Sequence, residues 1–339
     1  MPSLEEGLKS HMPARVFPPG EKIVYSNYGT SLAGYIVERV SGQSFEEYIE
    51  GNILSRLGME SSTFSQPLPK SLVANMSEGY NYADGKFHKG SFEFISAPAG
   101  GMSSTSHDMA KFMIANLQKG RFENETILQP DTIEKMQSRQ FCHHPKLSGF
   151  TYGFIDYEIN GQRIIGHDGT TMLFHTGMIL LPEHNIGMFV SLNGGSYKAK
   201  NNIINGFMDR YFPKDMQPIY QLTEGAKQRG KNYVGQYRTT RGSYTTKEKA
   251  LVVLGDSINI GVDDKGYLTA SFHGENYKFY EVEPGFYRNI NTEEDQLISS
   301  MVFEKESDGD GYFLSTGIAT YTSPPWYGTS TFLGLALAT

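Results

Sequence analysis

The order of apolar and polar residues in the first part of the chain predicts short helices separated by turns. Residues 1–24 have the pattern of an amphipathic segment followed by a loop, since the Pro-Pro-Gly run at 18–20 stops any helix. Apolar residues then recur at helical spacing over 26–40. Ser44 is placed to cap a further helix, with Glu47 as its partner in a capping box.

Another helix is predicted after a stretch rich in glycine, proline and serine. Residues 62–105 have the composition of loops. Ser106 is a suitable N-cap for a helix over 107–119, and Gly120 is a suitable residue to end it. A short helix is predicted to begin near Thr132.

The pattern changes to strands beyond residue 150. Alternating residues over 152–159 and 162–167 flank Asn160-Gly161, a dipeptide favoured in two-residue hairpins. Two further apolar runs, 174–181 and 186–193, flank a second turn. The four runs predict an antiparallel sheet that is buried on at least one face.

The last third predicts a different architecture. A helix over 201–211 is long enough to cover the sheet, and a stretch at 213–230 is predicted to be an exposed linker. Short strands separated by Gly and Asp turns then indicate a small barrel or sandwich. These strands are expected at 233–239, 250–254, 257–260, 267–272, 277–282, 285–288, 296–304 and 311–315. The fold class is therefore α+β, an antiparallel sheet with helices followed by a small all-β, barrel-like domain.

The composition narrows the class of protein. The chain has 339 residues, of which 38% are hydrophobic and 20% charged, so it can bury a sizeable core. A formal net charge of -7 gives no reason to expect a nucleic-acid partner. Cys142 is the single cysteine, which excludes an internal disulfide framework.

The two ends of the chain also carry information. The first residues lack the basic and apolar regions of a signal peptide. The end, 326–339, is apolar in its last part, but a membrane span needs about 20 apolar residues. This tail is interpreted either as a packed or disordered end or as the start of a membrane span.

Three stretches occur in an informative order. The first, from Phe17 to Phe64, contains PPG, Tyr-Ser-Asn, a helical pattern and LGMESSTF. The second is APAGGMSSTSHDMAKF at 97–112, and the third is His-Asp-Gly-Thr at 167–170, at the end of a predicted strand. Together they resemble the class C β-lactamase and D,D-peptidase family of penicillin-recognising serine hydrolases. Residues 228–320 more loosely resemble the lipocalin-like β-domain often appended to such hydrolases.

The resemblance implies a domain organisation. Residues 1–215 would form a partial β-lactamase-like hydrolase domain and 228–325 a lipocalin-like β-barrel, followed by the tail at 326–339.

The resemblance also implies roles for individual residues. In this family a Ser-x-x-Lys segment supplies the nucleophile, a Tyr-x-Asn loop a proton-transfer group and an amide, and a Lys-Thr-Gly-like strand a polar wall. Tyr25 then corresponds to the general acid/base, and Asn27 to the amide that holds the acyl group of the substrate. His167 takes the place of the strand lysine, Gly169 keeps the strand edge open, and the N–H of Thr170 is an oxyanion donor.

We expect the polar ends of Tyr25 and His167 to face one cleft within roughly 10 Å of each other, with Asn27 beside them. Without the surrounding pattern, a Tyr-x-Asn triplet is usually a helix cap with a core aromatic residue. His-Asp-Gly is commonly only a turn.

The nucleophile segment of the family is not found. No Ser-x-x-Lys occurs in residues 1–339, and the pairs Ser196/Lys198 and Ser243/Lys247 have the wrong spacing. The interpretation is an amino-terminally truncated hydrolase that is inactive alone. Because the amino-terminal strands of the family would then be missing, we expect an unpaired sheet edge and a poorly soluble or oligomeric chain.

Two other classes of function are weighed. Five histidines, His143, His144, His167, His175 and His184, could suggest a metal, but their spacing fits no known ligand motif. No metal and no cofactor is expected. A non-catalytic module that binds a peptide or lactam reversibly remains an alternative.

The implied partner is a small molecule or peptide: a β-lactam, a D-Ala-D-Ala peptide or an ester. The family's usual location is the outer face of a bacterial membrane. Membrane contact through the carboxy-terminal extension is a further alternative.

Overall fold

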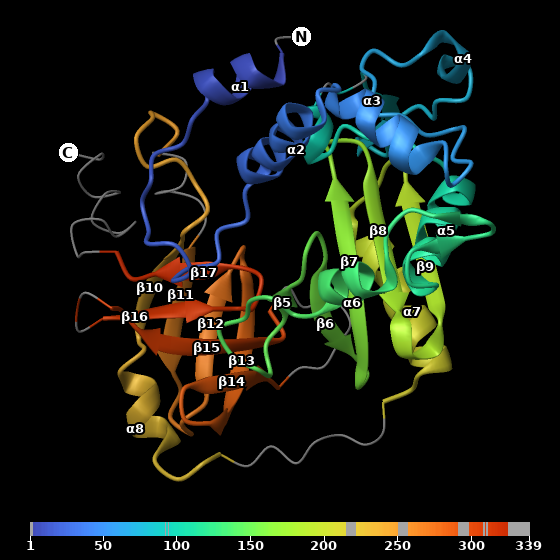
Figure 1. Ribbon diagram of the computed structural model, residues 1–339. Helices are drawn as coiled ribbons and strands as arrows, with labels where there is room; N and C mark the ends of the chain where they lie inside the picture. Colours follow the sequence, from blue (N-terminus) through green and yellow to red (C-terminus); the bar gives the residue numbers. More distant parts are fainter. Residues whose placement is uncertain are drawn as a thin grey trace. The chain divides into compact units, whose positions relative to one another are not determined.

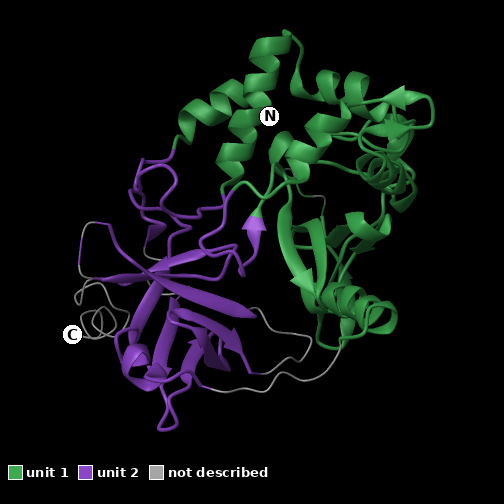
Figure 2. Ribbon diagram, turned by 60° about the horizontal axis from the view of Figure 1, so that its bottom comes forward, with its two compact units in different colours: residues 1–12, 26–140, 150–215 green, residues 13–25, 141–149, 216–339 purple. Residues whose placement is uncertain are grey.

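The computed structural model describes residues 3–91, 93, 95–214, 222–249, 257–290, 298–307, 309 and 311–324. Its chain divides into two compact units, which Figure 2 colours green and purple. Unit 1 contains residues 1–12, 26–140 and 150–215. Unit 2 contains residues 13–25, 141–149 and 216–339, so two short segments from the first half of the chain belong with the carboxy-terminal region.

Unit 1 contains helices and an antiparallel sheet (Figure 1). Its helical elements are α1 (Leu4–Ser10), α2 (Asn27–Ser41), α3 (Phe45–Ile49), η1 (Glu50–Leu54), α4 (Lys70–Val73), η2 (Ala97–Ala99), α5 (Ser106–Leu117), α6 (Pro130–Gln137), η3 (Pro182–His184) and α7 (Tyr197–Tyr211). Its strands are β1 (Tyr80–Ala83), β2 (Lys86–Lys89), β3 (Arg121–Phe122), β4 (Glu125–Thr126), β5 (Gly149–Phe150, whose first residue is assigned to unit 2), β6 (Ile155–Ile159), β7 (Gln162–Thr170), β8 (His175–Leu181) and β9 (Ile186–Leu192).

The central sheet has the strand order β5-β6-β7-β8-β9. The predicted hairpin at Asn160-Gly161 is confirmed, with Ile159 opposite Gln162 and both turn residues at positive φ. Asn160 and Gly161 have φ of 52° and 77°, as a type I′ turn requires. The second turn ends at Asn185, which is in the left-handed region, and leads into β9.

Two helices contribute to the two faces of this sheet. On one face, Met113 of α5 packs in a cluster with Ile165 and Met178. On the other, Ile204 and Met208 of α7 pack in a cluster with Ile164 and Ile179. Because successive strand residues alternate between faces, both sides of β7 and β8 are buried at their centres. The prediction that the late helix covers the sheet is confirmed.

The helical part of unit 1 is fixed by caps and close packing. Ser44 and Glu47 form the predicted capping box of α3. Gly34 of α2 packs so closely against η2 that an added Cβ would lie 2.6 Å from the ring of Pro98. This contact joins the Tyr-x-Asn helix to the APAGG segment.

Two local predictions in unit 1 were wrong. The N-cap of α5 is Thr105 rather than Ser106, because the Thr105 hydroxyl accepts the hydrogen bond from the N–H of Asp108. Residues 62–105 are not all loop, since they contain α4 and the hairpin of β1 and β2. That hairpin turns at Asp84-Gly85, both at positive φ, a turn signal that the composition of the segment obscured.

Unit 2 is a closed antiparallel barrel of eight strands, preceded by one short helix. Its elements are α8 (Ala226–Lys231), β10 (Gly235–Thr239), β11 (Ser257–Val262), β12 (Leu268–Phe272), β13 (Glu275–Glu283), β14 (Phe286–Asn289), β15 (Ser300–Lys305), β16 (Tyr312–Ser315) and β17 (Thr320–Thr322).

The prediction of a barrel-like domain is confirmed, and a strand that the sequence did not indicate closes it. β17 pairs with both β16 and β10, with Thr239 opposite Tyr321. Apolar and aromatic side chains form the barrel's core, including fully buried Phe279 and Tyr287. The strand predicted at 250–254 and the tail at 326–339 lie outside the described residues. No helix in the described part is long and apolar enough to cross a membrane.

Candidate active site

The predicted site residues on β7 lie where this strand continues past its neighbour. The ladder between β6 and β7 ends with Ile155 opposite Gly166. β7 goes on to Thr170, and in the described residues its ladder there is with β8; residues 168–170 are exposed while His167 is half-buried. The His-Asp-Gly-Thr stretch is therefore an accessible strand end of the kind that can receive an extended ligand.

Strand alternation divides this stretch between the two faces of the sheet. His167 lies opposite Met178, which belongs to the cluster on the α5 face. Gly169 is on the same face, and Asp168 and Thr170 are on the α7 face. In Figure 1 the arrow of β7 points toward α2 and α3, so the carboxyl end of β7 and these helices lie at the same end of unit 1.

Polar side chains continue from His167 across the neighbouring strands. Thr176 of β8 lies opposite Gly169, and its hydroxyl is 3.1 Å from that of Ser191 on β9. The α5 face of the sheet therefore changes from apolar at its centre to hydroxyl-bearing at this end. Such hydroxyls can hydrogen-bond to a carboxylate or amide.

Residues that do not belong to the sheet contact the turn between β7 and β8 and fix its position. Both carboxylate oxygens of Glu93 accept the N–H of Met172 at 3.1 Å. Leu173 is buried so closely against Gly79 and Gly90 that a Cβ on either glycine would lie within 2.7 Å of it. Local sequence did not predict these contacts, because they join segments about 80 residues apart.

Asn27 is the first residue of α2 and is exposed. The hydroxyl of Ser26 caps this helix by accepting the N–H of Gly29 at 3.1 Å. One turn further on, the buried hydroxyl of Ser31 lies 2.8 Å from that of Ser96, just before η2. Asn27 is thus exposed at the amino-terminal end of a helix whose next turn is fixed by the hydrogen bond between Ser31 and Ser96.

Tyr25 belongs to unit 2, and the boundary between the units falls between it and Ser26. Its ring is half-buried, and the guanidinium of Arg241 lies over it, with Cζ 5.0 Å from the ring centroid. The expectation that Tyr25 and His167 share one cleft stays a prediction.

A buried lysine that sequence reasoning missed lies behind the strand end. The side chain of Lys200 on α7 is 3% exposed, and its Nζ is 2.5 Å from Oδ2 of Asp168. The phenol of Tyr157 on β6 lies on the same face, and burial followed by the charge of Asp168 raises its pKa. The available signal was the spacing of Lys200 with Ile204 and Met208, which places all three on the buried face of α7.

The SSTSHD segment of the 97–112 motif has a structural role in this chain. The buried carboxylate of Asp108 accepts the N–H of Ser61 and the hydroxyl of Ser62, each at 2.8 Å. The hydroxyl of Ser104 is 2.8 Å from that of Ser62. Ser104 is therefore part of the network that ties α5 to the LGM segment.

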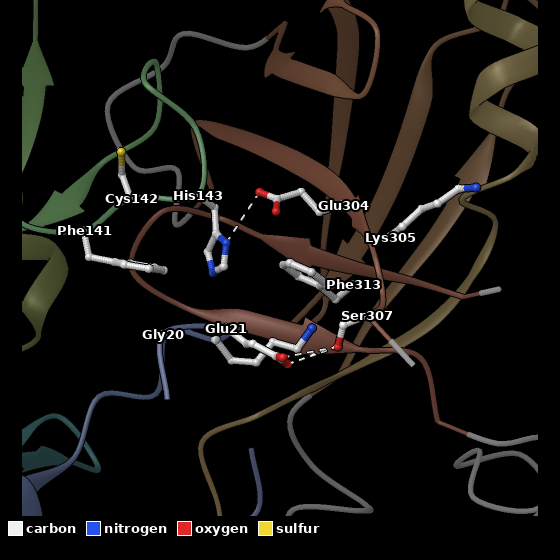
Figure 3. Close-up of a pocket in the computed structure, with 10 residues that line it drawn as sticks. Gly20, Glu21, Phe141, Cys142, His143, Glu304, Lys305, Ser307 and Phe313 are labelled. Carbon is white, nitrogen blue, oxygen red and sulfur yellow. Dashed lines mark hydrogen bonds and ion pairs between the residues drawn. The ribbon is translucent and has the colours of Figure 1, made fainter. Parts of the chain in front are cut away.

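Unit 2 contains a separate cavity of about 360 Å³ (Figure 3). The ring of His143 points toward the carboxylate of Glu304, with Nδ1 3.5 Å from Oε1. The Lys22 ammonium is buried over the ring of Phe313 and pairs with Glu306 at 2.6 Å. The residues of the β-lactamase-like motifs at 97–112 and 166–170 do not line this cavity.

Burial decides the charge of the histidine in this cavity. Burial first, and the Lys22 ammonium second, lower the pKa of His143 to about 4. Burial also raises the pKa of Glu304, whose Oε1 receives no hydrogen bond from the described residues. His143 and Glu304 are thus a neutral imidazole beside an under-solvated carboxyl at neutral pH. No cluster of three His, Cys, Asp or Glu side chains suited to a metal occurs in the described ranges.

Comparison with known proteins identifies the family to which the fold and the motifs belong. Residues 10–207 match the Beta-lactamase family. The chain is a member of that family. The match covers the Tyr-x-Asn helix, the APAGG segment and the strand end on β7, and it stops before the barrel begins.

Individual relatives are distant. A β-lactamase of Yersinia enterocolitica is 27% identical over 151 residues, which are 44% of this chain and 38% of that protein. Protein flp of Staphylococcus aureus strain MW2 is 25% identical over 175 residues, 52% of this chain and 34% of that protein. The chain thus spans a little over a third of the length of these curated relatives.

Solved structures show the fold over most of the chain. The octameric penicillin-binding protein homologue from Pyrococcus abyssi has a TM-score of 0.55 at 22% identity, covering 94% of this chain and 70% of that one. SurE has a TM-score of 0.63 at 17% identity, covering 96% of this chain and 74% of that one. Both cover more than the 10–207 region, so the likeness in fold includes the barrel region.

Proposed function

We propose that this member of the Beta-lactamase family binds an acyl-amide ligand along the end of β7, as one part of a serine hydrolase active site. The ligand class is a β-lactam, a peptide ending in D-amino acids or a small ester. The observation that carries the proposal is the exposed strand end at 168–170, which extends beyond β6 beside half-buried His167. An extended peptide or the amide of a lactam can hydrogen-bond to such a strand end.

Each motif residue has a role in this proposal. The exposed amide of Asn27 would hold the acyl group of the ligand, and His167 would form a polar wall. Gly169 carries no Cβ on the face where the ligand would lie, and the N–H of Thr170 would be an oxyanion donor. Tyr25 enters as the proton-transfer group through its motif, two residues before Asn27.

One structural neighbour supports the ligand class. SurE, which shares the fold, has been solved with D-Leu. A ligand with a D-configured residue is therefore compatible with this architecture. The identity of 18% limits this support to the fold.

The proposal includes the absence of self-acylation. Acylation needs a serine whose proton is taken by a neighbouring base, and residues 1–339 contain no Ser-x-x-Lys. Ser104, which lies in the 97–112 motif, is already hydrogen-bonded to Ser62. The chain by itself should bind a ligand without covalent turnover.

A pair of measurements with penicillins tests this function. A fluorescent penicillin should leave no covalently labelled band, whereas benzylpenicillin should bind saturably and reversibly in calorimetric titration. Asn27→Ala and His167→Ala should each weaken binding about tenfold, as the loss of a ligand hydrogen bond predicts. The matched controls Asn202→Ala and His184→Ala, at exposed positions outside the motifs, should bind like the unmodified chain. A labelled serine, or equal binding by all four variants, would contradict the proposal.

A purely binding, non-catalytic module is the second candidate. The absence of the Ser-x-x-Lys motif from residues 1–339 favours it. The two candidates separate when the Ser-x-x-Lys-containing segment of a relative is co-expressed with this chain. Labelling by fluorescent penicillin in that complex, lost again in the His167→Ala variant, favours the hydrolase. A well-formed complex without labelling favours the binding module.

A further inference from the structure

The ion pair behind β7 connects a helix to the strand end that carries the proposed ligand edge. Lys200 is one of the few charged residues that are buried in the described chain. Its ammonium group pairs with the carboxylate of Asp168, which lies at the surface. The Asp168 side chain is 58% exposed, so the pair joins the sheet interior to its rim.

The path of this lysine depends on a glycine in the intervening strand. Gly177 of β8 lies directly opposite Asp168 in the ladder. A Cβ at this position would lie 2.8 Å from Cδ of Lys200, 2.9 Å from Cδ1 of Ile204 and 3.2 Å from Oδ1 of Asp168. Any larger residue would displace the lysine stem or the carboxylate, so Gly177 provides the space through which Lys200 passes.

Two other titratable groups face the pair. Tyr157 on β6 lies close enough for the charge of Asp168 to raise its pKa. His175 on β8 lies on the same face, opposite Thr170, and its buried Nδ1 receives no hydrogen bond from the described residues. Neither replaces the carboxylate as a partner for the Lys200 ammonium at hydrogen-bonding distance.

The segment held by this pair is the part of β7 without the β6 ladder. The ladder with β6 ends at Gly166, and from His167 to Thr170 the described pairing of β7 is with β8. Asp168 is at the centre of that segment, between His167 and Gly169 on the opposite face. A contact that fixes Asp168 from behind therefore sets the direction in which its two neighbours face the ligand.

We propose that Lys200 is a positioning residue for ligand recognition, which holds the 167–170 strand end in place through Asp168 and the opening at Gly177. The proposal rests on the proposed function, because it assigns a purpose to the same strand end. Lys200 itself does not face the ligand, since α7 covers the opposite side of the sheet from His167. It acts through the backbone of β7.

Two variants of the pair, their combination and a control test this role. Lys200→Met removes the ammonium but keeps most of the apolar stem, and Asp168→Asn removes the carboxylate charge at a side chain that is 58% exposed. The double variant removes both charges. Lys198→Met, two residues away at an exposed position of α7, is the matched control. The readouts are amide hydrogen exchange, the thermal midpoint and the dissociation constant for benzylpenicillin.

Positioning predicts a local effect that a general loss of stability does not. Exchange at 167–170 should become about tenfold faster in each single variant, while the centre of β8 at 178–181 keeps its protection. Binding of benzylpenicillin should weaken about fivefold, and the double variant should be no worse than the poorer single variant, because the two residues act as one unit. Asp168→Glu, which keeps a carboxylate, should restore most of the protection.

Three results would overturn the proposal. The first is unchanged exchange at 167–170 in Asp168→Asn and Lys200→Met. The second is faster exchange spread evenly over 162–181 with a matching fall in the thermal midpoint, which indicates stabilisation only. The third is normal binding of benzylpenicillin despite faster exchange at 167–170. If the unmodified chain itself binds no penicillin, the proposed function fails, and the exchange pattern alone decides whether the pair fixes the strand end.

Discussion

The barrel of unit 2 and the sheet of unit 1 differ in whether their outermost strands are paired with each other. The barrel closes on itself through the pairing of β10 with β17, so each of its strands has a neighbour on both sides. The sheet is open, and in the described residues its order ends at β9. The strand end that we propose binds the ligand is also in the open sheet, where β7 extends beyond its ladder with β6.

This difference indicates which unit has unpaired strand groups that a ligand could bind. In the described residues the barrel interior is filled by a cluster of apolar and aromatic side chains, and the closed ladder leaves no unpaired strand edge. An open sheet keeps backbone groups available, with the attendant risk of association.

The interior of the barrel should be the most sensitive part of unit 2. Phe279 is fully buried there, so Phe279→Ala should lower the free energy of unfolding of the barrel by about 3–5 kcal/mol. Differential scanning calorimetry measures this loss. Ile318→Ala, at a side chain that is 44% exposed, should change it by less than about 0.5 kcal/mol. Equal effects of the two variants would mean that the barrel interior is not tightly packed.

Acid should destabilise unit 2 through His143. Its pKa in the folded chain is about 4, below the usual 6.5, so the unfolded chain binds the extra proton first as pH falls. The stabilisation is complete above pH 6.5 and is lost between about pH 6.5 and 4, at a cost of roughly 2–3 kcal/mol. Glu304 opposes this loss, because its raised pKa favours protonation in the folded state.

The pH effect is isolated by a neutral replacement. The unfolding free energy of His143→Gln should vary less between pH 7 and pH 4.5 than that of the unmodified chain. His184→Gln, at an exposed histidine, should retain the full pH dependence. A parallel dependence in all three proteins would exclude His143 as the responsible group.

Apolar side chains exposed on α7, next to the last strand of the open sheet, should promote self-association. Ile203 and Tyr211 are 46% and 62% exposed on α7, which packs against β9, the last strand in the order. Light scattering after size exclusion should detect oligomers of the chain alone, and Ile203→Lys should weaken association by about 1–2 kcal/mol. Asn202→Lys adds the same charge next to it and should have a smaller effect. A monodisperse monomer at all concentrations would show that the open sheet needs no partner.

The smallest effect concerns a local helix signal. Ser44→Ala removes the capping box of α3 and should cost about 1 kcal/mol in the unfolding free energy of unit 1. Ser55→Ala, at an exposed serine just after η1, should have almost no effect. Chemical denaturation of both variants measures the difference. A neutral Ser44→Ala would mean that tertiary contacts alone fix this helix.

Local features of the fold could be read from the sequence, and contacts between distant segments could not. The Asn160-Gly161 hairpin and the Ser44 cap depend on neighbouring residues, and both are confirmed. β17 was missed because a strand of three residues carries almost no periodic signal, although it closes the barrel. The assignment of 13–25 and 141–149 to unit 2 likewise depends on contacts with residues more than a hundred positions away.

The candidate site divides in the same way. Motif order suggested Asn27 and the strand end at 167–170, and both lie within the 10–207 match to the family, but their roles in a site stay predictions. Lys200 could not be assigned to Asp168 from the sequence, because that contact requires the register that places Gly177 opposite Asp168. The relation of Tyr25 to His167 depends on the two units together and stays a prediction.

The interleaving of the two units has a consequence for biosynthesis. The chain passes between the units after residues 12, 25, 140, 149 and 215. Within unit 2 the N–H of Ile23 donates to the hydroxyl of Thr320, a contact across 297 positions in sequence. At about 5–20 residues per second, synthesis across the 297 positions that separate them takes about 15 seconds or longer. During this interval Ile23 cannot form its contact with Thr320, so the 13–25 segment cannot complete its packing in unit 2 until synthesis has passed residue 320.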